Sequence, residues 1–296
     1  MTKLYHIIRS MRPHQWTKTL VVFAGLIFSH NLTDASLAAR SVIAFFLYCA
    51  LSGAVYLIND IADAEKDRLH ETKKNRPIPS GKLRPTEAGV AAAVLMIGSL
   101  ILSYRLGMSF FLVALLFSVL NVSYSISLKR VVLLDVFCIS ISFVLRAIAG
   151  VEALAATDSS IELSPWLLIC TLFLSLFLAF CKRRYELVTL ERGTEHRESL
   201  AEYSPALLDQ LVAVSAGGAV LSYSIYTIWP DTVAKFGTSL LVYTIPLVLI
   251  GVMRYQYLVY NKEKGGSPSD VLLSEKFILV DVFLWIVLVI AILYFF

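Results

Sequence analysis

Residues 53–67 read Gly53-Ala54-Val55-Tyr56-Leu57-Ile58-Asn59-Asp60-Ile61-Ala62-Asp63-Ala64-Glu65-Lys66-Asp67, so an apolar run passes directly into a group of acids. Asn59, Asp63 and Asp67 are four residues apart, and at about 100° per residue Asp60 falls on the same side of a helix. Such like charges destabilise a helix unless a cation joins them. Mg²⁺ prefers oxygen ligands from one or two carboxylates and a diphosphate. The pattern therefore predicts a site for Mg²⁺ (or Mn²⁺) and a diphosphate, with Asp60, Asp63 and Asp67 as metal ligands and catalytic residues and Asn59 beside the substrate.

A solvated acidic helix end is the alternative interpretation of this segment, with Lys66 or Lys73 as ion-pair partners. The acids, however, follow an apolar run at once, where ionisable groups are costly and by default suggest function. We therefore favour the metal and diphosphate site.

The composition is typical of an integral membrane protein. Of the 296 residues, 57% are hydrophobic and 16% are charged, and the mean hydropathy is +0.72, whereas soluble domains carry ~25% charged residues. Apolar windows able to cross ~30 Å of hydrocarbon recur along the whole length. We expect a single membrane domain over residues 1–296, surrounded by membrane lipids. The net charge of +4 is too small to indicate a nucleic-acid partner.

Residues 1–17 mix apolar and basic side chains, as in a short amphipathic helix that lies in the membrane interface. From residue 18 onward, we predict an all-α fold with nine transmembrane helices, each near the ~17–25 residues that a crossing helix needs, although the first is short. Their apolar windows are 19–32, 37–58, 86–104, 108–125, 131–155, 163–181, 207–229, 238–257 and 277–296.

Basic residues predict the orientation of these helices. Lys and Arg number four in 1–18, seven in 61–85, two in 129–130, five in 182–206 and four in 254–276, which is 22 of the 26. Because cytoplasmic loops carry the excess of Lys and Arg, these segments are expected on the cytoplasmic side of the inner (plasma) membrane. The same orientation gathers the polar motifs at a cytoplasm-facing cavity.

The basic segment after the acids contains Lys73 and Arg76. Topology alone explains most of its cations. The closeness of Lys73 and Arg76 to the acids nevertheless favours a role for both on the phosphate oxygens of a substrate.

Asp135 and Arg146 are eleven residues apart, which is about three helical turns and about 16 Å of rise. Because an Arg within an apolar window is usually functional, we expect Arg146 to face the cavity at a deeper level and to bind substrate with Asp135. A buried pair with an acid or with helix carbonyls is the alternative. Tyr124 and Lys129 precede this helix at the cytoplasmic mouth, although Tyr124 suits an aromatic interface position equally well.

Several of these segments together resemble the UbiA-type intramembrane prenyltransferases. Asn59–Asp67, followed by His70–Leu83, looks like the first acidic signature of that family. Within it, the decaprenyl-phosphate phosphoribosyltransferase branch is the most similar. The matching segments are Arg12–Lys18, Tyr124–Lys129, Asp135 with Phe143–Gly150, Lys182–Leu187, and Arg254–Tyr257 before Gly265-Gly266.

This resemblance implies a UbiA-like fold and a Mg²⁺-dependent transfer. The donor would be phosphoribosyl pyrophosphate, the acceptor a decaprenyl-like polyprenyl phosphate, and the leaving group pyrophosphate. The resemblance also adds Lys18 to the substrate-binding residues. One departure is Thr19, where the branch tends to have Asn.

A second departure concerns the place of the second acidic motif, which here holds Lys182-Arg183-Arg184-Tyr185-Glu186. A ribose 5-phosphate donor and a lipid phosphate acceptor bring two anionic groups beyond the diphosphate. Lys182 and Arg183 would supply the extra positive charge, because Arg can bind phosphate through two parallel hydrogen bonds. Glu186 would then be an outer ligand of the metal or of a ribose hydroxyl. A basic helix end that merely follows the topology is the alternative.

Two other functions remain open. An ordinary UbiA-type prenyltransferase would join a prenyl diphosphate to an aromatic or tetrapyrrole acceptor, but the basic segment at 182–184 argues against it. A transporter or lipid-binding membrane protein would more often show polar residues at mid-membrane in two matching halves. Clustering of the motifs on one side gives that alternative little support.

Overall fold

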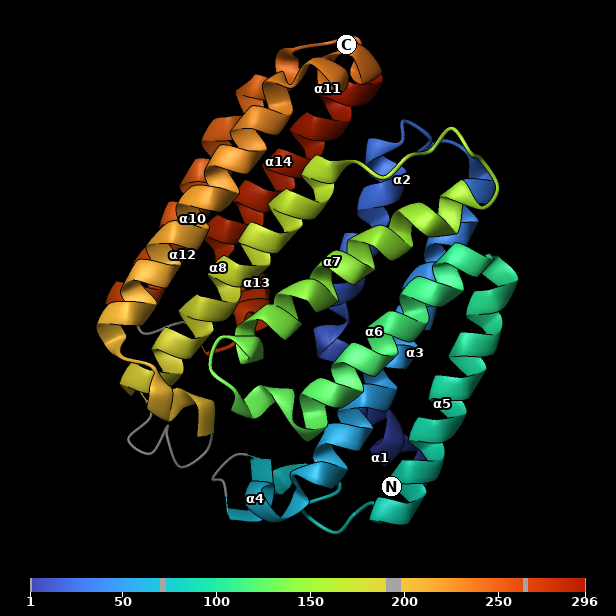
Figure 1. Ribbon diagram of the computed structural model, residues 1–296, viewed down its shortest axis with the longest axis vertical. Helices are drawn as coiled ribbons and strands as arrows, with labels where there is room; N and C mark the ends of the chain where they lie inside the picture. Colours follow the sequence, from blue (N-terminus) through green and yellow to red (C-terminus); the bar gives the residue numbers. More distant parts are fainter. Residues whose placement is uncertain (1, 70–72, 190–197, 263–265, 296) are drawn as a thin grey trace. The chain divides into compact units, whose positions relative to one another are not determined.

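The computed structural model describes residues 2–69, 73–189, 198–262 and 266–295, and over these ranges it contains helices, turns and connecting segments but no strand (Figure 1). The chain forms two compact units, Met1–Leu163 and Ser164–Phe296, each with its own packed helices. A division into units does not test the expected single membrane domain, which stays a prediction.

Over its described residues, the first unit contains seven α-helices and three 3₁₀ helices (η). In chain order its elements are α1 (Lys3–Ser10), η1 (Pro13–Phe23), α2 (Ala24–Phe28), α3 (Ala35–Ala62), α4 (Ala64–Leu69), η2 (Lys73–Asn75), α5 (Pro85–Leu106), α6 (Met108–Ile126), η3 (Leu128–Arg130) and α7 (Leu134–Ala155). The second unit contains α8 (Pro165–Thr189), η4 (Glu198–Glu202), α10 (Pro205–Ile228), α11 (Pro230–Phe236), η5 (Leu240–Thr244), α12 (Ile245–Asn261), α13 (Pro268–Ser274) and α14 (Lys276–Phe295).

Helix α3 is the centre of the first unit and packs against η1, α5, α6 and α7. Its start is capped by Asp34, whose carboxylate accepts hydrogen bonds from two backbone N–H groups that the helix leaves unpaired. Midway along α3, the buried ring of Tyr48 lies 4.9 Å from that of Phe117 and 5.8 Å from that of Phe110 on α6. This aromatic core fixes α3 beside α6 and so determines where its acidic end lies.

The predicted first span, 19–32, corresponds to η1 and the short helix α2. This segment lies very close to α7, because a Cβ added at Gly150 would stand only 2.0 Å from the carbonyl oxygen of Val22. Among the described residues, eight helices are long and apolar enough to cross a membrane, and they correspond to the other eight predicted windows. Nine crossings therefore stay a prediction, with 19–32 as the undecided one.

The acidic segment is not one uninterrupted helix, as the four-residue spacing had suggested. Helix α3 ends at Ala62, and α4 begins at Ala64 after a turn at Asp63. Backbone hydrogen bonds from Asp63 N to Asn59 O (2.9 Å) and from Asp67 N to Asp63 O (2.8 Å) keep the chain near the helical path across this break. The acids before and after the turn, Asp60 and Asp67, share Arg76, whereas Asp63 at the turn pairs with Lys129.

The loop that follows α4 is anchored by an apolar cluster. Ile78 and Leu83 are almost fully buried and belong to one cluster with Leu57 of α3 and Ala88 of α5. Figure 1 accordingly shows α4 and the start of α5 at the same end of the unit as the N-terminal helix α1. The cluster holds the basic loop against the acidic end of α3.

In the second unit, α8 packs along α10, and α12 packs against both α10 and α14. Polar contacts join three of these helices near one end. Arg184 of α8 donates to Asp209 of α10 (2.7 Å) and stacks on the ring of Tyr260 of α12, whose hydroxyl also donates to Asp209 (2.8 Å). This clamp fixes the last turns of α8, which carry the basic motif.

Candidate active site

Asp60 is almost fully enclosed, with a side chain only 1% exposed. Its Oδ1 accepts hydrogen bonds from Arg12 and from Arg76 Nη1 (3.2 Å). Its Oδ2 is buried and has no hydrogen-bond partner among the described residues. One oxygen of this carboxylate is therefore neutralised, and the other is left as a potential ligand.

Arg76 joins two of the acids. Besides Asp60, its Nη1 contacts Asp67 Oδ2 at 2.6 Å, and Lys73 Nζ lies 3.8 Å from Asp67 Oδ1. The loop itself places the guanidinium, because Arg76 N donates to Lys73 O (2.9 Å) and Ser80 N donates to Arg76 O (3.0 Å). The structure thus brings Lys73 and Arg76 to the acids, as their closeness in the sequence suggested.

Lys129 contacts Asp63, the acid at the turn. Its Nζ lies 2.7 Å from both carboxylate oxygens of Asp63 and 3.2 Å from Asn59 Oδ1. Lys129 belongs to η3, in the connection between α6 and α7. This connection therefore reaches the end of α3, although the two segments are 66 residues apart.

The balance of charge in this cluster is positive, since Arg12, Lys73, Arg76 and Lys129 surround only three carboxylates. Within the described ranges, no group of three or more His, Cys, Asp and Glu residues is arranged to hold a metal ion. Mg²⁺, however, commonly takes only one or two carboxylates and completes its shell with water and phosphate oxygens. The unpartnered Asp60 Oδ2 and the half-buried Asp63 are donors of that hard oxygen type, so the residues fit a cation that arrives with a diphosphate.

Arg146 is buried in the first unit, on α7. Its Nη1 donates to Ser142 Oγ (2.7 Å) and Ser142 O (3.0 Å), its Nη2 donates to Ser52 Oγ of α3 (3.1 Å), and the guanidinium lies over the ring of Phe117 at 4.6 Å. Ser52 precedes Asn59 by seven residues, which is about 10 Å along a helix. Arg146 therefore contacts α3 about two turns before the acids, where it is held by hydroxyls, a helix carbonyl and rings. The carbonyl contact matches the alternative interpretation, and a role of Arg146 on a substrate stays a prediction.

The remaining site predictions in the first unit lie in the same helices. Asp135 is fully buried in the first turn of α7, and half-buried Tyr124 lies near the end of α6. Lys18 lies in η1, where its Nζ donates to Gln15 Oε1 (3.2 Å). The roles of these residues on a substrate stay predictions.

Lys182, Arg183 and Glu186 form a separate cluster in the second unit, in the last turns of α8. Arg183 is fully buried and donates to Glu186, while Lys182 Nζ lies 3.8 Å from Glu186 Oε1. Another ion pair joins Arg254 of α12 to Glu275 at 2.6 Å. Lys182 and Arg183 thus pair with a carboxylate of their own helix, and their predicted role as phosphate ligands stays a prediction. Residues 70–72 and 265 of the family-like segments lie outside the described residues.

Sequence reasoning missed three partners. Arg12 belonged to a family-like segment but was not connected with Asp60, which is 48 residues away. Ser52 and Ser142 were not connected with Arg146 either. Small hydroxyls in apolar windows at helical spacing from an intramembrane Arg would have been a usable signal for these two.

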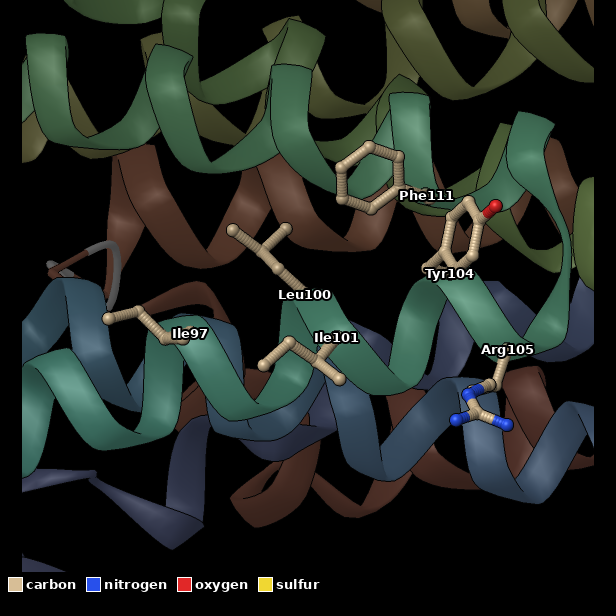
Figure 2. Close-up of a pocket in the computed structure, with 6 residues that line it drawn as sticks. All are labelled: Ile97, Leu100, Ile101, Tyr104, Arg105 and Phe111. Carbon is tan, nitrogen blue, oxygen red and sulfur yellow. The ribbon is translucent and has the colours of Figure 1, made fainter.

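A groove of about 610 Å³ runs along the second half of α5 and reaches α6, away from the acids, which lie beside the start of α5. Figure 2 shows its lining, which is apolar except at one end: Ile97, Leu100, Ile101, Tyr104, Arg105 and Phe111. The groove lacks the carboxylates and clustered cations of the polar site, so it does not mark a diphosphate site.

Comparisons with known proteins identify the family and the fold. The model of the UbiA prenyltransferase family matches residues 19–287. The decaprenyl-phosphate phosphoribosyltransferase of Mycolicibacterium smegmatis is 31% identical over 300 residues, covering 98% of this chain and 92% of that protein. The protein of that name from Corynebacterium glutamicum is 33% identical over 298 residues, covering 97% and 86%.

Among solved structures, a UbiA homolog from Archaeoglobus fulgidus bound to GPP and Mg²⁺ has the same fold, with a TM-score of 0.73 over 97% of this chain and 99% of that chain. Its sequence identity of 17% carries the likeness no further than the fold. Family model, near-full-length relatives and apolar helices lead to one conclusion: the chain is a multi-pass membrane protein and belongs to the UbiA prenyltransferase family.

Proposed function

We propose that this protein transfers 5-phosphoribose from phosphoribosyl pyrophosphate to a decaprenyl-like polyprenyl phosphate and releases pyrophosphate. The observation that carries the proposal is the identity of 31% and 33%, over nearly the whole chain, to two proteins named decaprenyl-phosphate phosphoribosyltransferase. The cation-rich acidic end of α3 supports it chemically, because donor and acceptor are both anionic.

The pyrophosphate of the donor binds at the end of α3. Arg76, Lys73 and Lys129 already stand 2.6–3.8 Å from carboxylate oxygens there, so a diphosphate that reaches the same place meets three cations. Their positive charge stabilises the negative charge that develops on the leaving group as the C1–O bond of the ribose breaks. Asn59, whose Oδ1 accepts from Lys129, keeps that ammonium beside Asp63.

Asp60, Asp63 and Asp67 hold the divalent cation in this proposal, with Asp60 contributing the Oδ2 that lacks a partner among the described residues. When bound, Mg²⁺ or Mn²⁺ supplies a compact positive charge that polarises the pyrophosphate. The three carboxylates would fix the position of the cation. Arg12 and Arg76 pair with Asp60, so this buried carboxylate is not left as an uncompensated charge.

The acceptor is a lipid phosphate, and its oxygen forms the new bond to C1 on the face opposite the leaving group. Because this nucleophile is already an anion, the reaction needs no strong general base. This agrees with the described residues of the site, none of which is a His. Lys182 and Arg183 bind the donor 5-phosphate or the lipid phosphate, with Glu186 as their carboxylate partner or as a ligand of a ribose hydroxyl. Lys18, Tyr124, Asp135 and Arg146 complete the substrate-binding set.

The site faces the cytoplasm from the inner membrane. The distribution of Lys and Arg supports this orientation. Of the 26 such residues in the chain, 22 belong to the segments that the expected topology places on the cytoplasmic side. Phosphoribosyl pyrophosphate is water-soluble, so it has to reach the site from an aqueous side, whereas the polyprenyl phosphate enters from the bilayer.

One assay tests the proposal. Purified protein in detergent or vesicles receives labelled phosphoribosyl pyrophosphate, decaprenyl phosphate and Mg²⁺, and the lipid extract is scored for label. Labelled lipid, lost on chelation and restored by Mg²⁺ or Mn²⁺, is the expected result. Consumption of a prenyl diphosphate with an aromatic acceptor, and none of phosphoribosyl pyrophosphate, would replace the proposal by the prenyltransferase alternative.

A further inference from the structure

The turn between α1 and η1 holds Arg12 in an unusual backbone conformation. Arg12 has φ 53° and ψ 64°, in the left-handed region, and Pro13 follows it. Residues other than glycine adopt this region at a cost in free energy, and they persist there only where surrounding contacts hold them. Contacts with the rest of the unit must therefore hold this turn in place.

One such contact is with Gly53 in the middle of α3. A Cβ added at Gly53 would lie 2.9 Å from two side-chain atoms of Met11 and 3.1 Å from a third, its Cβ. Because Met11 precedes Arg12, the missing side chain at Gly53 is what lets the turn lie against α3. A larger residue at that position has to displace the Met11 side chain, including its Cβ, which is attached to the turn.

From this docked turn, the Arg12 side chain runs along α3 toward its acidic end. Its guanidinium lies over the ring of Tyr56 at 4.8 Å and donates to Asp60 Oδ1. Gly53, Tyr56 and Asp60 are separated by three and four residues, so they follow one another on one side of the helix. The Arg12 side chain is thus held at its backbone by the turn against Gly53, and at its guanidinium by the ring of Tyr56 and the carboxylate of Asp60.

The consequence falls on Asp60. Both arginines that reach this carboxylate bind Oδ1, and Oδ2 is left without a partner among the described residues. The Arg12 side chain is 16% exposed, compared with 27% for Arg76, and Arg76 is shared with Asp67. Arg12 is thus the more enclosed of the two, and among the described residues it pairs with no second acid.

We propose that Arg12 is a positioning residue, held by the Met11–Gly53 contact, that fixes the Asp60 carboxylate so that its Oδ2 remains the ligand oxygen for a divalent cation bound with a diphosphate. The inference rests on the proposed function for the nature of that ligand. It adds that the N-terminal turn, and not only the acidic motif, determines how the cation is held. Partners that orient a metal ligand typically change metal affinity by about 10- to 100-fold when they are removed.

The first experiment measures binding rather than turnover. Mn²⁺ binding to the full-length protein in the presence of inorganic pyrophosphate is followed by electron paramagnetic resonance. Arg12→Gln is expected to weaken it by about 10- to 100-fold, and Arg12→Lys to restore part of the loss. Arg9→Gln, a change at an exposed Arg in the same N-terminal segment, should leave it unchanged. Equal affinity in Arg12→Gln and wild type would overturn the inference.

A second experiment separates position from charge. Gly53→Ala alters no charge, and yet it should weaken Mn²⁺ binding because the added methyl group displaces Met11 and with it Arg12. Adding Met11→Ala to Gly53→Ala removes the clash and should restore binding. Gly98→Ala on α5 is the matched control, since a Cβ there meets no atom within 4 Å. Wild-type binding in Gly53→Ala, or no recovery in the double variant, contradicts the positioning role.

The two proposals fail in different ways. If the wild type binds Mn²⁺ with pyrophosphate and the variants behave as expected, but no labelled lipid forms, the phosphoribosyl transfer is wrong and the role of Arg12 stands. If labelled lipid forms and Arg12→Gln keeps both its Mn²⁺ affinity and its KM for phosphoribosyl pyrophosphate, the role of Arg12 is wrong. A wild type that binds no Mn²⁺ with pyrophosphate overturns the inference as well.

Discussion

Asp60 and Asp63 lie three residues apart and have different surroundings. Asp60 is buried and held by two guanidinium groups through one oxygen, whereas Asp63 has a side chain 26% exposed and is held by the ammonium of Lys129 through both oxygens. In the proposed site, Asp60 Oδ2 would be available to a cation that arrives with a diphosphate, whereas the oxygens of Asp63 would first have to leave Lys129. The two carboxylates should respond differently to substitution.

Asp60→Asn and Asp63→Asn keep the size of each side chain and remove its charge. Both are expected to lower kcat/KM for phosphoribosyl pyrophosphate by at least about 100-fold, because each deletes a charged ligand oxygen of the cation. Asp60→Asn should show the larger loss, since it also leaves Arg12 without its acid. Glu65→Gln, at an exposed acid of α4, is the control and should keep its rate. Near-normal kinetics in both Asp variants would contradict the metal site.

The parts of this site that the sequence predicts well are those close in the chain. Arg76 was expected at the acids because only nine residues separate it from Asp67, and the turn from Lys73 to Leu83 does bring it there. Arg12 was not expected there, because its contact with Asp60 depends on its own left-handed backbone conformation and on the space at Gly53. Neither property can be derived from local spacing, since both come from how two distant segments pack.

At the scale of elements, a half-buried cation, Arg40, joins helix ends. Arg40, in the second turn of α3, donates from Nε to Ala153 O of α7 (2.6 Å) and from Nη2 to Leu106 O, the last residue of α5. These carbonyls belong to helix C-terminal turns, where backbone acceptors lack intrahelical partners and a positive charge is favourable. One side chain therefore ties three helices together.

Arg40→Met keeps much of the length of the side chain and removes both hydrogen bonds. We expect the free energy of unfolding to fall by about 2–4 kcal/mol. Each of the two bonds from a charged donor is worth about 1.5–3 kcal/mol, and the partial exposure of Arg40 reduces their sum. The measurement is the midpoint of thermal unfolding in detergent, followed by tryptophan fluorescence. Arg105→Met, at an exposed residue of α5, should change the midpoint little. If both variants melt together with the wild type, Arg40 does not tie the helices.

The end of α8 is the element on which the choice of donor depends. Lys182→Glu places a carboxylate where a phosphate is expected, and near a protein surface two close unit charges interact by about 4 kcal/mol before relaxation. We expect the KM for phosphoribosyl pyrophosphate or for polyprenyl phosphate to rise by about tenfold or more, because the side chain is 34% exposed and part of the repulsion is screened. Lys262→Glu, at an exposed residue after α12, is the control. Unchanged kinetics in Lys182→Glu would favour a basic helix end without a substrate.

At the scale of the whole molecule, hydropathy was the most reliable guide. Eight of the nine apolar windows correspond to helices able to cross a membrane, because in a bilayer each such segment satisfies its backbone hydrogen bonds internally. The window at 19–32 was less certain, since η1 begins at Pro13 and the whole segment lies against α7 through Gly25 and Gly150. Close backbone packing of this kind is invisible to a hydropathy window.

Orientation in the membrane is the remaining whole-molecule prediction, and single cysteines at exposed loop positions test it. In a variant whose four native cysteines are replaced, Lys82→Cys and Lys262→Cys should react with a membrane-impermeant maleimide only after the cytoplasmic side is opened, because their segments carry the excess of Lys and Arg. Ser159→Cys, between α7 and α8, should react from the opposite side. Lys82 and Lys262 belong to different units, so labelling of both from the same side would test the orientation of the whole chain. If Lys82→Cys and Lys262→Cys were labelled from opposite sides, the acids of α3 and the cations of α8 would face different compartments, and a single site for donor and acceptor would be impossible.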